Sequence, residues 1–145
     1  KYDFILKIKG AGKDFKQDFN KVEPSDWSIE KEVSDFQSLD IGIYPLAGNS
    51  WDMGKTGFKT VQYLAVGVPC VVSNVGSNRE IIKDGINGFL VGSEDEWVDK
   101  ISKLIEDPQI YRSFMKEGRK TVEEKYSIKA NCNKFLEIMK NAERK

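Results

Sequence analysis

Short apolar runs alternate with helical stripes of apolar residues along most of the chain. Runs bounded by glycine or proline predict strands at residues 3–9, 19–23, 40–44, 68–72 and 89–91. Apolar residues spaced three and four positions apart predict helices at residues 28–37, 58–66, 79–83, 93–106, from 107 onward and from 127 onward. This alternation predicts a Rossmann-like α/β fold with a doubly wound, mostly parallel sheet, in a single domain over residues 1–145.

Capping residues mark the ends of the predicted helices. The expected N-caps are Ser28, Ser93 (in a capping box with Glu96), Asp107 (followed by a proline) and Ser127. Gly67 suits a left-handed C-cap, and Pro69 then ends the helix. The predicted inward faces consist of Ile29, Val33, Phe36, Gln37, Phe58, Val61, Ala65, Trp97, Ile101, Leu104, Ile105, Tyr111, Phe114 and Met115. The last helix carries a core or docking stripe of Ile128, Cys132, Phe135, Leu136 and Met139.

Two loops, at residues 45–56 and 73–78, follow strands at the carboxyl edge of the predicted sheet, where open parallel sheets bind ligands. In the first, Gly54 and Gly57 flank Lys55 and Thr56 just before a helix. A helix start with nearby lysines suits a phosphate, although an ordinary turn with solvated lysines has the same pattern. Trp51 in this loop fits equally a lid over a pocket and a plug at the edge of the core.

Composition narrows the possible functions. The 145 residues carry 23 basic and 23 acidic side chains, so no net charge favours a nucleic acid or a strongly anionic surface. The chain has no histidine, which removes a histidine-based triad, a histidine general base and the commonest metal ligand. Cys70 and Cys132 read as core thiols, which suits a reducing compartment. Gly10 and Gly12 follow a strand, but without a third glycine and a helix they make no dinucleotide motif.

Three motifs in order carry a family resemblance. Residues 57–73 read GFKTVQYLAVGVPCVVS, residues 76–82 GSNREII and residues 84–91 DGINGFLV. Together with the strand at residues 40–44 and its Pro45, they resemble the donor-binding C-terminal domain of GT-B retaining glycosyltransferases of family four. The resemblance covers about residues 33–127. It implies the C-terminal half of a GT-B enzyme that transfers a sugar, with retention, from a nucleotide-diphosphate sugar to a glycan or lipid-linked acceptor in polysaccharide biosynthesis.

The resemblance also assigns roles to residues. The backbone N–H groups of Gly57 and Phe58, with Lys59 and Lys55, would stabilise the departing diphosphate, and Pro45 would stand beside the donor. Two glutamates of the family fall on Gly54 and Gln62 here. Gln62 can still accept a hydrogen bond from a ribose hydroxyl, whereas sugar recognition would have to move to Lys55 or Asp52. We expect no metal and no cofactor besides the donor substrate.

The same resemblance implies segments of a glycosyltransferase that residues 1–145 do not contain. Family members have a first strand with a phosphate-clamping loop and an N-terminal acceptor domain, so the chain reads as a fragment that alone would transfer nothing. We expect a cytoplasmic location and no nucleic-acid partner. Peripheral association of the full-length protein with the inner face of the membrane is compatible with this expectation. The alternatives are a nucleotide-sugar 2-epimerase of GT-B architecture and a degenerate interaction module. A receiver-type signalling domain fits less well, because it needs an acidic cluster where Gly10 and Gly12 stand.

Overall fold

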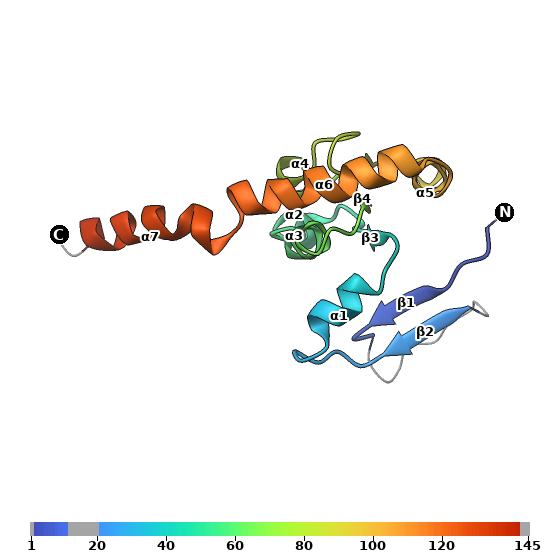
Figure 1. Cartoon of the computed structure of the whole chain (residues 1–145), viewed down its shortest axis with the longest axis horizontal. Helices are drawn as coiled ribbons and strands as arrows, with labels where there is room; N and C mark the ends of the chain where they lie inside the picture. Colours follow the sequence, from blue (N-terminus) through green and yellow to red (C-terminus); the bar gives the residue numbers. More distant parts are fainter. Residues whose placement is uncertain (1, 12–20, 143–145) are drawn as a thin grey trace. The chain divides into compact units, whose positions relative to one another are not determined.

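The structure, a computed structural model, describes residues 2–11 and 21–142 of the chain. They form two compact units, Lys1–Leu39 and Asp40–Lys145 (Figure 1). Every strand pairing among the described residues is parallel, as predicted, but the strands make two sheets, one in each unit.

The first unit pairs β1 (Leu6–Lys9) with β2 (Val22–Ser25), followed by α1 (Glu32–Gln37). The predicted second strand began at residue 19, which lies outside the described residues. The Ser28 cap is wrong, because the chain makes a turn in which the Lys31 N–H donates to the Ser28 carbonyl at 3.3 Å, and α1 starts only at Glu32. Of the expected inward face, Ile29 and Val33 are exposed.

The second unit holds a three-stranded parallel sheet in the order β3 (Gly42–Tyr44), β4 (Cys70–Ser73) and β5 (Phe89–Val91). Gly42 pairs with Cys70, and Val71 pairs with Phe89. All four residues of β4 are buried, as expected for a parallel strand covered on both faces. Six helices accompany the sheet: α2 (Ser50–Met53), α3 (Phe58–Ala65), α4 (Asn78–Ile81), α5 (Glu94–Glu106), α6 (Pro108–Lys125) and α7 (Ile128–Ala142).

Successive side chains of β4 enter two different cores. Cys70 and Val72 pack in a cluster with Leu64 of α3 and Val122 of α6. Val71 packs in a second cluster whose other buried members are Phe89, Val91, Leu104 and Phe114. The rings of Phe89 and Phe114 meet edge to face, with centroids 4.8 Å apart. Helices therefore cover both faces of the sheet, which is the doubly wound arrangement.

Three of the four predicted N-caps are confirmed. Ser93 Oγ accepts from the Glu96 N–H, Asp107 Oδ1 accepts from the N–H groups of Gln109 and Ile110, and Ser127 Oγ accepts from the Ala130 N–H. Gly67 has φ +74°, so the left-handed C-cap of α3 is confirmed as well. In the capping box, the Glu96 carboxylate reaches the Gly92 N–H instead of the N-cap residue.

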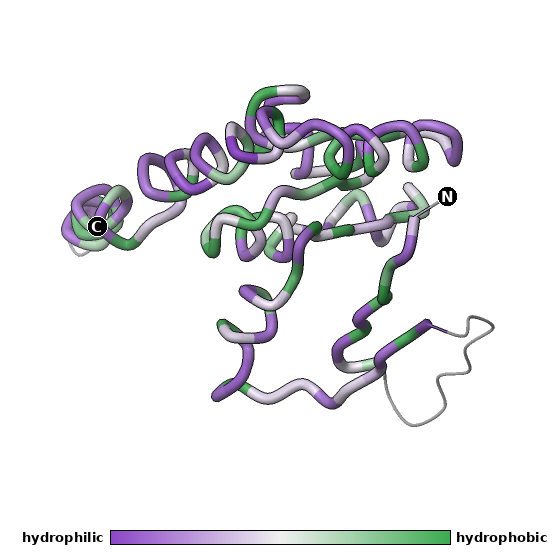
Figure 2. The backbone as a smooth tube through the Cα atoms, turned by 45° about the vertical axis from the view of Figure 1, so that its right-hand side comes forward, coloured by the Kyte–Doolittle hydropathy of each residue, from purple (hydrophilic) through white to green (hydrophobic). Residues whose placement is uncertain are grey.

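The predicted inward faces are partly wrong. Phe58, Ile105 and Met115 are exposed, whereas the polar Thr60 is buried. Other members of the stripes are buried as predicted, among them Leu104 and Phe114. Figure 2 shows polar and apolar residues alternating along the helices. On α7 the whole stripe is exposed, including Cys132, which is therefore no core thiol. No helix among the described residues is long and apolar enough to cross a membrane.

The contact between β3 and α3 gives a first test of the packing. A Cβ added at Gly42 would lie 2.5 Å from the ring of Tyr63, whose hydroxyl donates to the Ile43 carbonyl at 3.0 Å. Because this anchored ring cannot move aside, we expect Gly42→Ala to lower the free energy of unfolding by about 1–3 kcal/mol. Urea denaturation measures the change. Gly92→Ala is the control, since its Cβ would meet nothing nearer than 3.6 Å; equal losses in both variants would contradict the packing.

Candidate functional site

The loop after β3 contains a short helix that the sequence did not predict. Residues 47–53 read as a loop, but the Asn49 side chain accepts a hydrogen bond from the Asp52 N–H at 2.9 Å and caps α2. Trp51 on this helix is 79% exposed, so it is no plug at the edge of the core. Its role as a lid stays a prediction.

Asp52 is buried and braces this loop from inside. Its Oδ2 accepts from the N–H groups of Ala47 at 2.8 Å and Gly48 at 3.2 Å, and its Oδ1 pairs with Lys55 Nζ at 2.7 Å. The hydrogen bond from Lys55 is the largest influence on the carboxyl group and lowers the pKa of Asp52, while the same bond raises the pKa of Lys55. The two residues predicted to recognise a sugar or phosphate are thus bonded to each other.

The start of α3 has the geometry predicted for an anion site. Gly57 adopts φ +66° and occupies the N-cap, and no side chain of the described residues caps this helix. The first N–H groups of a helix have no acceptor within it, and the positive end of the helix dipole lies at the same place. Lys59 is half-buried in the first turn, and Phe58 is exposed beside it.

Gln62 lies one turn further along α3. Its Oε1 is buried and has no hydrogen-bond partner among the described residues. An unpaired buried acceptor is costly, so this atom is a candidate for bonding to a ligand hydroxyl. The neighbouring Tyr63 is not a candidate for an ionised group in the site, because burial raises its pKa to about 12 and keeps the hydroxyl neutral.

The loop after β4 touches the loop after β3. The Leu46 N–H, next to the exposed Pro45, donates to Ser73 Oγ at 2.8 Å. A Cβ at Gly76 would lie 3.1 Å from the Met53 carbonyl oxygen. The structure therefore brings Pro45, Asp52, Lys55 and the start of α3 to one edge of the sheet, as the sequence predicted.

Two buried polar residues at this edge were missed. Thr60 Oγ1 donates to Asn78 Oδ1 at 2.7 Å, and Asn78 Nδ2 donates to the Ser73 carbonyl at 3.0 Å. One sequence signal could have identified Thr60 as buried: it lies one helical turn before the buried Leu64, on the same face of α3.

The third motif, at residues 84–91, forms a braced turn. Asp84 Oδ1 accepts from the Leu90 N–H, and Asn87 Oδ1 accepts from the Lys83 N–H, both at 2.8 Å. Asn87 Nδ2 donates to the Ile81 carbonyl and to Thr121 Oγ1 of α6. These side chains are used in folding the turn and docking it on α6.

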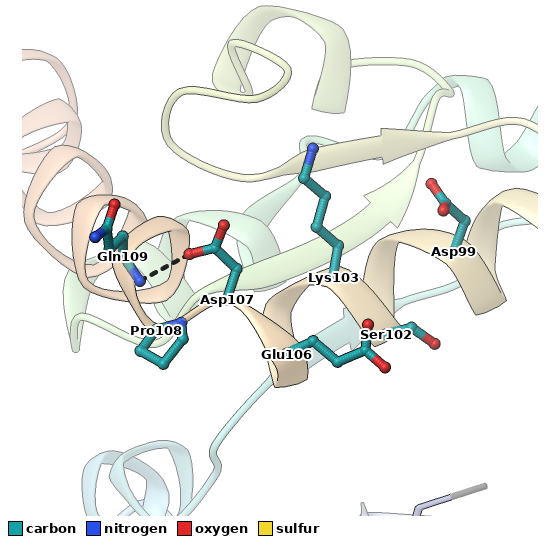
Figure 3. Close-up of a pocket in the computed structure, with 7 residues that line it drawn as sticks. All are labelled: Asp99, Ser102, Lys103, Glu106, Asp107, Pro108 and Gln109. Atoms are coloured by element: carbon teal, nitrogen blue, oxygen red, sulfur yellow. Dashed lines mark hydrogen bonds between the residues drawn. The ribbon is translucent and has the colours of Figure 1, made fainter.

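Figure 3 shows a hollow at the junction of α5 and α6. Its lining consists of Asp99, Ser102, Lys103, Glu106, Asp107, Pro108 and Gln109, and includes none of the predicted site residues. Near this junction the Tyr111 hydroxyl donates to the carbonyl of Asp40, two residues before β3. The hollow therefore belongs to the amino edge of the sheet, opposite the ligand-binding edge.

A comparison with protein families agrees with this arrangement. The family described as "Glycosyl transferases group 1" matches residues 37–121, from the end of α1 into α6. The chain belongs to this family. The matched range includes the loop after β3, the start of α3 and the loop after β4, so the edge described above lies inside the family's shared region.

Curated proteins similar to this group 1 chain are longer. It is 34% identical over 67 residues to the "Putative glycosyltransferase EpsD" of Bacillus subtilis, a match of 45% of this chain and 18% of that protein. It is 26% identical over 101 residues to the "Capsular polysaccharide biosynthesis glycosyltransferase CapM" of Staphylococcus aureus, covering 68% of this chain and 25% of that protein. The chain spans less than half the length of the curated relatives it matches.

Solved structures share the fold of this group 1 chain. HepE from Anabaena, in complex with UDP and glucose, has a TM-score of 0.74 at 18% identity, over 84% of this chain and 32% of that one. The C-terminal domain of LpcC, a group 1 protein from Francisella tularensis, has a TM-score of 0.63 at 22% identity, over 74% of this chain and 55% of that one. The fold is that of a GT-B Rossmann-like domain, as predicted.

The N-cap of α3 supplies a second prediction. A Cβ at Gly57 would lie 2.5 Å from Ile81 Cδ1 and also strain the left-handed backbone, so we expect Gly57→Ala to cost about 2–4 kcal/mol of unfolding free energy. Gly85→Ala is a matched control, because φ is +73° there and nothing lies within 4 Å. It should cost only the backbone strain, about 1 kcal/mol. Thermal denaturation of both variants measures the difference, and a milder loss at position 57 would refute the contact.

The Asp52–Lys55 pair makes stability depend on pH. Because the pKa of Asp52 is lowered from 3.8 in the folded state, its stabilisation is present above that value and is lost as the pH falls through the lower, folded pKa. We expect Asp52→Asn to be less stable than the parent at pH 7 and to lose less further stability on acidification below about pH 4. Urea titrations at pH 7 and pH 3 compare the two. Parallel acid losses in both proteins would show that the pair is not formed.

Proposed function

We propose that the chain is the donor-binding domain of a retaining glycosyltransferase. The enzyme would move a sugar from a nucleotide-diphosphate sugar to a glycan or lipid-linked acceptor in polysaccharide biosynthesis. The observation that carries the proposal is the start of α3, inside the family's matched range. It joins a left-handed Gly57, an N-terminus without a side-chain cap and Lys59 in the first turn.

The proposal assigns roles to the residues at the start of α3 and to Gln62. The N–H groups of Gly57 and Phe58 and the ammonium of Lys59 would stabilise the diphosphate as it leaves, through charge and oriented dipoles. Such a departure needs no covalent enzyme intermediate and, on this reading, no metal. The buried Oε1 of Gln62 would accept from a ribose hydroxyl, which would satisfy an otherwise unpaired acceptor.

The ion pair changes the role of two predicted residues. Asp52 already accepts from two backbone N–H groups and pairs with Lys55. The Asp52 carboxylate is therefore better placed to stabilise the loop than to bind a sugar hydroxyl. Lys55 would act on the diphosphate as half of this pair, with its charge partly neutralised by Asp52.

Binding of the acceptor requires a further domain of the protein. We propose that the acceptor binds to a separate N-terminal domain, as the family resemblance implies, in a protein located in the cytoplasm or peripherally at the membrane. CapM is named for capsular polysaccharide biosynthesis, which supports a glycan product. HepE was solved with UDP-glucose and with UDP, so a uridine nucleotide is the first donor to test.

The alternatives make different products. Full-length protein incubated with nucleotide sugars should release nucleotide only with an acceptor if it is a transferase. A 2-epimerase would change the sugar without an acceptor, and an interaction module would do neither. Mass spectrometry of the sugar nucleotide separates these outcomes.

The role of Lys59 predicts a loss of nucleotide affinity. Uridine diphosphate, titrated to millimolar concentration against the 145-residue chain, should bind saturably, and Lys59→Ala should weaken binding about tenfold through loss of a charged phosphate contact. Calorimetry measures both affinities. Lys120→Ala is the control, because it removes an exposed lysine of α6 whose nearest ion pair is 4.0 Å long. Equal affinities in all three proteins would contradict the assigned phosphate site.

A further inference from the structure

A chain of buried and part-buried hydrogen bonds joins the segments around the start of α3. Leu46 N–H, after β3, donates to Ser73 Oγ at the end of β4. The carbonyl of Ser73 accepts from Asn78 Nδ2 at the start of α4, and Asn78 Oδ1 accepts from Thr60 Oγ1 in the first turn of α3. We call these four residues the Thr60–Leu46 relay.

The orientation of the Asn78 amide follows from its partners. The Ser73 carbonyl can only accept, so the Nδ2 group must face it and Oδ1 must face α3. Thr60 can then donate its only hydroxyl proton to Oδ1. Because Thr60, Ser73 and Asn78 are buried, water does not replace a partner that is lost, and each bond constrains the next.

Asn78 also touches the N-cap of α3 directly. A Cβ at Gly57 would lie 3.2 Å from Asn78 Oδ1 and 3.7 Å from the Asn78 backbone nitrogen. One side chain therefore bonds to Thr60 and lies close to the N-cap Gly57, three residues earlier on α3. These contacts determine where the first N–H groups of α3 lie relative to the carboxyl end of β4.

We infer that Thr60 and Asn78 are positioning residues of the donor site, which act by holding the N-terminus of α3 at the distance from β4 that a nucleotide diphosphate requires. The inference rests on the proposed function. Neither residue needs to contact the ligand. Preorganised N–H groups bind an anion without being reordered, and a displacement of about 1 Å is enough to lower such binding strongly.

Removal of one hydroxyl tests the relay. Thr60→Val keeps the shape but leaves Asn78 Oδ1 unpaired, and we expect about tenfold weaker binding of uridine diphosphate to the 145-residue chain. Thr60→Ser restores the hydroxyl and should return the affinity to within about twofold of the parent. Thr60→Ala, with a strong helix former, replaces the valine variant if that protein does not fold.

A control separates positioning from general destabilisation. Leu104→Val weakens the other core cluster, on α5, and should lower the melting temperature without changing the affinity measured well below it. Hydrogen exchange of the Val61 amide, which donates to the Gly57 carbonyl at 3.1 Å, supplies a second readout, because it should rise in Thr60→Val and stay unchanged in Leu104→Val.

The outcomes distinguish this inference from the proposed function. If the parent chain binds no uridine, adenosine or guanosine diphosphate, the donor site itself is wrong and the relay has no such role. If the parent binds and both Thr60→Val and Thr60→Ala bind equally well, the donor site stands and the relay inference is overturned. Weaker binding in the control to the same degree would also overturn it, since destabilisation alone would then explain the loss.

Discussion

Burial of β4 on both faces is the constraint on which the second unit depends. A parallel strand cannot be joined to its neighbours by tight turns, so the chain returns through α3 before β4 and through α4 before β5. Each return begins with a loop at the carboxyl edge of the sheet. The same topology that fills both cores therefore gathers the loops after β3 and β4, and with them the start of α3, at one place.

Several polar groups at this edge are used to hold its loops in place. Asp52 and Lys55 neutralise each other and brace the loop after β3, while Thr60, Asn78 and Ser73 connect α3 to β4. By contrast, within residues 2–11 and 21–142 the N-terminus of α3 has no side-chain cap and the buried Oε1 of Gln62 has no hydrogen-bond partner. Such an arrangement favours a site whose binding groups are few and are kept in place by neighbours that do not bind.

Local chemistry in the sequence was sufficient for much of the fold. Glycine and proline after residue 66 predicted the end of α3, Asp107 and Pro108 predicted the start of α6, and the run at Val71 predicted a buried parallel strand. These signals depend on the backbone conformation of a few adjacent residues, so they can be read without knowing the rest of the molecule. The resemblance likewise located Gly57 and Lys59 correctly at the start of a helix.

Other features depended on residues distant in sequence, and only the tertiary structure decided them. The period of a helix predicts an apolar stripe but not the neighbour that covers it, which is why Phe58 and the stripe of α7 are exposed. Lys55 and Asp52 are a local exception: they read as separate ligand groups because the sequence predicts a loop there, whereas the short helix α2 brings side chains three residues apart together. Thr60 and Asn78 are 18 positions apart and meet only because α3 and α4 follow adjacent strands. The sequence by itself thus determined most of the elements and the edge of the sheet at which the candidate residues gather, while contacts formed in the folded chain decided which side chains there are already bonded to one another.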